Sequence, residues 1–138
     1  MHPTPAREPL VFDFLDPEQD KVLDHCLRKL LASDPEQLRG FMGPDPTASS
    51  WFAEYGENGF ECRLKQAALR EMYRDWPKWA QYKVTAYDFD GFDRLARYYT
   101  ATAFEDAIRC ALRQYARAFP LRRPQLETLL RDLQLDRP

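Results

Sequence analysis

The chain has 138 residues, of which 44% are hydrophobic and 30% are charged. This length is close to the commonest size of a single domain, and the composition argues against disorder along most of the chain. A net charge of −2 excludes a strongly basic nucleic-acid-binding protein, and no apolar run approaches the roughly 18 residues that cross a bilayer.

The N-terminal segment differs in composition from the rest of the chain. Residues 1–9 hold three prolines and few apolar groups, so we expect a loose arm followed by one globular domain at 10–138. The apolar run at 10–15 predicts either a strand or an extended segment that docks on the core. We therefore expect the domain to begin with an apolar segment.

Two copies of Asp-Pro-Glu-Gln predict two helix starts. Asp16 and Asp34 suit the N-cap, and the proline that follows each suits the first helical position. The first helix carries an apolar stripe, and the shorter second helix ends at Gly43-Pro44. The residues of the stripe are Val22, Leu23, Cys26, Leu27, Leu30 and Leu31.

The middle of the chain is ambiguous. Asn58-Gly59 lies between short aromatic stretches and is typical of a hairpin turn, while Trp51-Phe52 after a serine can equally open a helical turn. The spacing at 62–73 predicts a helix, which Trp76-Pro77 ends.

A β-hairpin is predicted next. Residues 82–87 form the best strand candidate in the chain, and the aspartates and glycine of 88–91 suit a turn. The stretch 92–102 fits either a helix or a strand that pairs back on 82–87. We favour the hairpin.

The surest helix follows this hairpin. Thr102 and Glu105 have the spacing of a capping box, and Pro120 ends the helix. Its apolar face predicts the central packing element, and Pro124 starts a final leucine-rich helix. The face consists of Phe104, Ala107, Ile108, Ala111, Leu112, Tyr115 and Phe119. The predicted fold class is α+β, a helix-rich single domain with one antiparallel β-hairpin, and the alternative is all-α.

One short segment carries a catalytic pattern. Residues 84–91 read Val-Thr-Ala-Tyr-Asp-Phe-Asp-Gly, which resembles the first motif of the haloacid-dehalogenase-like phosphatases. The resemblance implies Asp88 as nucleophile and Asp90 as general acid and base, with magnesium screening the charge. However, Phe92 stands where the family has threonine, and the 47 residues after Gly91 leave no room for that family's parallel sheet. A phosphatase-like enzyme is therefore our third hypothesis.

Metal and cofactor sites are not indicated. Cys26, Cys62 and Cys110 are far apart, and neither His2 nor His25 lies at ligand spacing from a cysteine pair. Glycine-rich phosphate loops are absent from the sequence. We expect no cofactor and no metal, and the odd number of cysteines favours reduced thiols in the cytoplasm.

A cluster of aromatic and basic residues is the best candidate site. Trp76, Trp79 and Tyr82 surround a helix break next to lysines, and tryptophan, tyrosine and arginine are enriched in binding hot spots. The alternative is that both tryptophans fold inward and cap the core. The predicted partner-binding residues are Trp76, Lys78, Trp79, Tyr82, Lys83, Arg94 and Arg97.

The charge distribution bears on the kind of partner. Residues 1–77 hold 9 basic and 14 acidic side chains, whereas residues 78–138 hold 11 basic and 8 acidic ones. We predict a non-enzymatic protein-binding module, such as an inhibitor, immunity protein or adaptor, that contacts an acidic protein. The bias toward arginine over lysine favours a bacterial type. A nucleic-acid-binding accessory protein is the second hypothesis, and no membrane is expected as a partner.

Overall fold

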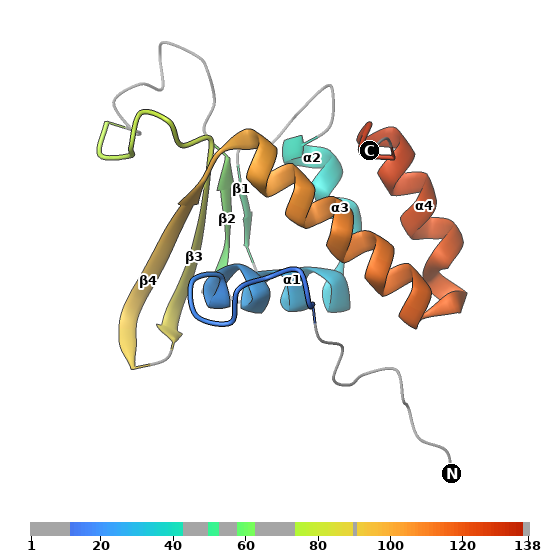
Figure 1. The fold of residues 1–138 in the computed structure, drawn as a ribbon, viewed down its shortest axis with the longest axis horizontal. Coiled ribbons are helices and arrows are strands. Elements are labelled where there is room, and N and C mark those ends of the chain that lie inside the picture. Colours follow the sequence, from blue (N-terminus) through green and yellow to red (C-terminus); the bar gives the residue numbers. More distant parts are fainter. Residues whose placement is uncertain (1–11, 43–49, 53–57, 63–73, 90, 137–138) are drawn as a thin grey trace.

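The computed structural model describes residues 12–42, 50–52, 58–62, 74–89 and 91–136. A four-stranded antiparallel sheet has the order β1-β2-β3-β4, and the described helices lie on one side of it (Figure 1). The strands are β1 (Ser50–Phe52), β2 (Asn58–Cys62), β3 (Tyr82–Phe89) and β4 (Phe92–Tyr99). The α-helices are α1 (Lys21–Ser33), α2 (Leu38–Met42), α3 (Ala101–Ala118) and α4 (Arg123–Asp132), with the 3-10 turns η2 (Pro35–Gln37) and η4 (Pro120–Arg122). The predicted α+β class is confirmed, and the predicted arm at 1–9 lies outside the described residues.

The predicted hairpin is formed by β3 and β4. Tyr82 lies opposite Tyr99, and the register continues to Tyr87 opposite Arg94. The chain reverses where Asp88 and Gly91 have positive φ angles of 52° and 84°. The helical alternative for 92–102 is wrong up to Tyr99, because these residues form β4 and pair with β3 across the hairpin.

The β1–β2 region departs from the predictions in its details. Trp51-Phe52 lies in β1 and not in a helical turn, and Asn58-Gly59 lies in β2, paired with Ala86 and Thr85, and not at a turn. Cys62 ends β2 and is not helical. The rest of the helix predicted at 62–73 lies outside the described residues.

The start of α1 is shifted from its predicted position. The carboxylate of Asp16 accepts hydrogen bonds from the backbone N–H groups of Glu18 and Gln19, both at 2.8 Å, as an N-cap does. The residues that follow form turns, and the regular helix begins at Lys21. Ahead of it, Phe12 is buried in the core within a turn, so the first segment docks on the core and is not a strand over its described residues.

Helix α3 is the packing centre, as predicted. Phe104, Ile108 and Leu112 are completely buried, and the Phe104 ring stacks on Tyr82 of β3. The predicted capping box at Thr102 is wrong: Thr100 is the N-cap, and its hydroxyl accepts a hydrogen bond from the N–H of Ala103 at 3.1 Å. Because β4 ends at Tyr99, the helix starts at once, and Thr102 falls inside its first turn.

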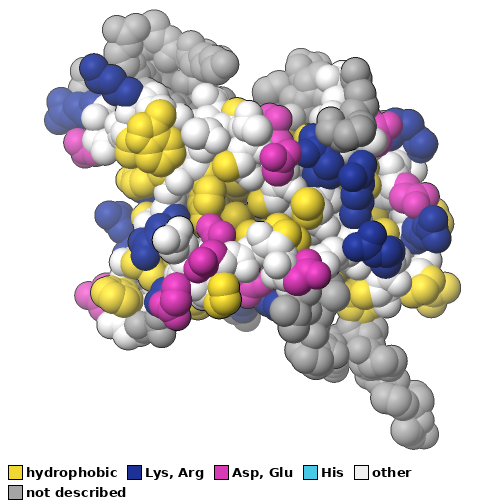
Figure 2. Space-filling view, in the orientation of Figure 1, with side chains coloured by type: hydrophobic (Ala, Val, Ile, Leu, Met, Phe, Trp, Pro, Cys, Tyr) yellow, Lys and Arg dark blue, Asp and Glu magenta, His cyan; other side chains and the backbone are white. Residues whose placement is uncertain are grey.

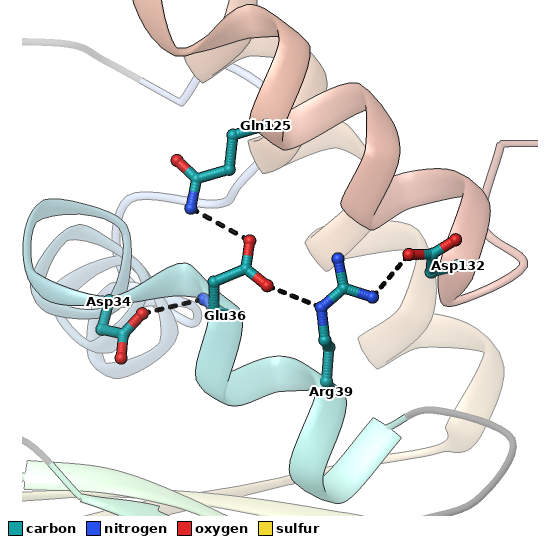
Figure 3. A network of polar contacts seen from close by, with 5 residues as sticks. All are labelled: Asp34, Glu36, Arg39, Gln125 and Asp132. Carbon is teal, nitrogen blue, oxygen red and sulfur yellow. Dashed lines mark hydrogen bonds and ion pairs between the residues drawn. The ribbon is translucent and has the colours of Figure 1, made fainter.

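Helix α4 is fixed to η2 and α2 by a polar network (Figure 3). Arg39 donates to Glu36 and to Asp132, with both donor–acceptor distances at 2.6 Å. Gln125 donates to the second carboxylate oxygen of Glu36 at 3.0 Å. On the same side of α4, the guanidinium of Arg122 donates to the carbonyl oxygen of Leu31 at 2.8 Å. These contacts hold α4 against the N-terminal helices.

Candidate functional site

A tight turn precedes β3 and presents two of the predicted site residues. The N–H of Ala80 donates to the carbonyl of Pro77 at 3.0 Å, so Lys78 and Trp79 are the two central residues of a β-turn. Both side chains are exposed, and Trp79 retains 59% of its accessible surface. Tryptophan is usually mostly buried, so this exposure is unusual.

The turn is held from below by a small apolar cluster. Trp76 is only 7% exposed, and its ring meets the ring of Tyr98 edge-on at a centroid distance of 5.6 Å. Ala80, at the other end of the turn, is buried in the same cluster. The N–H of Gln81 then donates to the carbonyl of Tyr99 at 2.9 Å, which ties the turn to β4. Trp79 therefore sits on a rigid support.

The face of the β3–β4 hairpin opposite the helices carries further rings and cations, on either side of Thr85, which is only 4% exposed. Directly paired residues share a face, so Lys83 with Tyr98 and Tyr87 with Arg94 lie on the face opposite the helices. The ammonium of Lys83 lies over the Tyr98 ring at 5.9 Å from its centroid. In Figure 2, hydrophobic and basic side chains gather together at the upper left, over the segment that precedes β3.

We call this surface the aromatic face. It combines rings and cations, and Tyr87 is 39% exposed. Its residues are Lys78, Trp79, Lys83, Tyr87, Arg94 and Tyr98.

The structure separates the seven predicted site residues. Lys78, Trp79, Lys83 and Arg94 lie on the aromatic face, while Trp76 supports it from within the apolar cluster. Tyr82 and Arg97 lie outside the aromatic face.

Tyr82 and Arg97 lie on the helix-covered face of the sheet. Tyr82 is 6% exposed and stacks on Phe104 at a centroid distance of 4.1 Å. Arg97 is paired with Val84 and donates to the carbonyl of Ala96 at 2.9 Å. Alternation along the two strands, which places Tyr87 and Tyr98 outward, is the signal that would have corrected the predicted set.

Two titratable groups on the helix side are buried within the fold. Burial raises the pKa of the Cys26 thiol to about 12, against two weak hydrogen bonds to the carbonyls of Gly59 and Thr85. Burial, followed by a 2.8 Å hydrogen bond to Asp20, raises the pKa of Tyr99 above its ordinary value. The Cys26 thiol stays protonated near neutral pH and is no nucleophile.

The phosphatase-like motif lies in a different setting from that of the family it resembles. The described strands all pair antiparallel, and Asp88 is an exposed residue at the hairpin end, while Asp90 lies outside the described residues. Across the described ranges, no group of three His, Cys, Asp or Glu side chains is arranged to hold a metal ion. In the same part of the chain, no helix is both long and apolar enough to cross a bilayer.

Comparisons with known proteins assign neither a family nor a function to the chain. No family model, curated protein or solved structure matches the chain. Inference about function therefore depends on the geometry of the molecule itself.

Proposed function

We propose that the protein is a small non-enzymatic protein-binding module, of the inhibitor, immunity-protein or adaptor type, and that it binds through the aromatic face. One observation carries the proposal: Trp79 is 59% exposed at the tip of a turn that buried Trp76 supports. A rigid, exposed ring loses little conformational entropy on binding, and tryptophan is the residue most enriched in hot spots.

The charges on this face favour an acidic partner. Lys78, Lys83 and Arg94 lie among the rings, whereas residues 1–77 hold 9 basic and 14 acidic side chains. An acidic protein is thus attracted to the cations of the aromatic face.

A site-specific cross-link tests the proposal. A photoreactive amino acid at position 79 is compared with one at position 121, because Leu121 is 98% exposed in η4, away from the aromatic face. In cells of the source, we expect a protein adduct at position 79 and none of the same size at position 121. With the partner purified, Trp79→Ala should weaken binding by about 30-fold or more, while Leu121→Ala leaves the affinity unchanged.

The same experiment also distinguishes a protein partner from the alternative, a nucleic-acid partner. Exposed rings flanked by cations also stack single-stranded bases. A nuclease-sensitive adduct at position 79, with an affinity that falls steeply as salt rises, would replace the protein partner by a nucleic acid. Equal adducts at positions 79 and 121 would remove the aromatic face as a site.

A further inference from the structure

A second, chemically different surface lies between α3 and α4. An open groove of about 510 Å³ runs between these helices, and basic side chains gather over it on the right of Figure 2. Four arginines line it, Arg113 and Arg117 from α3 and Arg123 and Arg131 from α4, and we call it the arginine groove. Its remaining lining residues are Ala116, Glu127, Leu130 and Asp136.

The guanidinium groups of the groove use only part of their hydrogen-bonding capacity within the protein. Arg123 pairs with Glu127 at 2.8 Å, and Arg113 donates to the backbone carbonyl of Asp136 at 3.1 Å. Arg131 reaches only the Thr128 hydroxyl, at 3.4 Å. The side chain of Arg117 has no hydrogen bond or ion pair with any residue that the structure describes. Since a guanidinium carries five N–H donors, most donors in the groove remain available.

Helix stability does not account for all of these cations. Arg117 and Arg131 lie in the last turns of their helices, where the helix dipole favours a positive charge. Arg123 lies in the first turn of α4, where the dipole opposes it, and no acidic residue lies in that turn. Neighbouring Arg122 has a packing role, with its guanidinium 5.3 Å from the Tyr115 ring centroid. Arg123 has only an exposed pair with Glu127, which contributes little.

We propose that the arginine groove binds a ligand that carries two or more linked phosphate groups. Planar guanidinium groups match phosphate oxygens in bidentate fashion, and the volume lies in the range of small-molecule pockets. Four arginines against Glu127 and Asp136 leave the lining with a formal charge of +2, in a chain whose net charge is −2.

The groove fits phosphates better than an acidic peptide. Ala116 and Leu130 are each only 5% exposed, so the floor offers almost no apolar surface for peptide side chains. The accessible lining comes largely from the arginine side chains, which offer guanidinium groups to a compact dianion from both helices. The linked phosphates can belong to a free small molecule or to a nucleic-acid strand, because both present the same oxygens.

Calorimetric titration of the full chain with pyrophosphate at low salt tests the site. Arg117→Ala and Arg131→Ala should each weaken binding by about tenfold, because each removes a charged donor. Glu127→Gln should strengthen binding about threefold, since it removes an opposing charge and releases Arg123. Lys29→Ala, which removes an exposed cation of α1 outside both proposed surfaces, is the control and should leave binding unchanged. Melting curves establish that each variant is folded.

The outcomes are distinct. Absence of pyrophosphate binding to the folded wild type would overturn the proposal, as would equal effects of Arg117→Ala and Lys29→Ala. Single-stranded oligonucleotides of increasing length then distinguish the two sources of phosphate. An affinity that grows with length and is lost with Arg117→Ala supports the site and assigns a strand, whereas an affinity that stays below that for pyrophosphate supports the site and assigns a small molecule.

Discussion

Helix α3 and the turn at residues 76–80 differ in where regularly spaced large side chains lie. In α3 they all lie in the core, whereas in the turn one lies in the core and one in solvent. In α3, Phe104, Ile108 and Leu112 follow one another at intervals of four residues, and all three are completely buried. In the turn, Trp76 and Trp79 are three residues apart, and one is 7% exposed and the other 59%. A spacing of three or four residues gathers side chains on one face only while the helix continues. Where the chain turns, the same spacing separates them.

The largest expected effect is at the centre of α3. Ile108→Ala removes a completely buried side chain and should lower the free energy of unfolding by about 4 kcal/mol, through lost burial and the cavity left behind. Leu112→Ala should fall in the same range of about 2–5 kcal/mol. Urea denaturation measures both. If both variants melt within a degree or two of the wild type, α3 is not the packing centre.

The two tryptophans give the next effect and the sharpest contrast. Trp76→Ala should lower the free energy of unfolding by about 3 kcal/mol, because the ring packs against Tyr98 in a small peripheral cluster. Trp79→Ala should change it by less than about 0.5 kcal/mol, as is usual for a surface residue. Thermal melts of the two variants, measured side by side, compare their losses of stability. Equal losses would mean that Trp79 is also a core residue and would remove it from the aromatic face.

The smallest effect concerns the polar network on α4. The hydrogen bond from Arg39 lowers the pKa of Glu36 from its ordinary value of 4.5. Because the pKa is lower in the folded state, this contribution is complete above pH 4.5 and is lost as pH falls through the folded-state pKa. Glu36→Gln should therefore lose less stability than the wild type between pH 6 and pH 3.

The size of this pH effect is limited by exposure. The Glu36 side chain keeps 37% of its accessible surface, so solvent screening holds the difference below about 1 kcal/mol. Urea titrations of both proteins at the two pH values measure it. An identical loss in wild type and variant would show that the network does not couple α4 to pH.

Periodic segments were predictable from the sequence, because one repeating spacing decides their whole burial pattern. The apolar stripes of α1 and α4 are buried as predicted, and so is that of α3 up to Leu112, while Tyr115 and Phe119 at its end are only partly buried. The residues at 82–87 form a strand that pairs with the residues after the turn. Local chemistry was a weaker guide. Thr100 and Thr102 are both able to cap a helix, and the end of β4 selects Thr100.

The candidate surfaces were decided only by tertiary structure. Strand register places Lys83 and Arg94 on one face of the sheet and Arg97 on the other, which the order of residues around the turn does not reveal. Likewise, the excess of basic residues after residue 77 was evident, but Arg117 and Arg131 line one groove only because α4 packs on α3. The sequence by itself determined the helices, the hairpin and the α+β class, since these depend on spacing along the chain. Surfaces for partners depend on which segments pack together, and this pairing arises from contacts between residues far apart in the sequence.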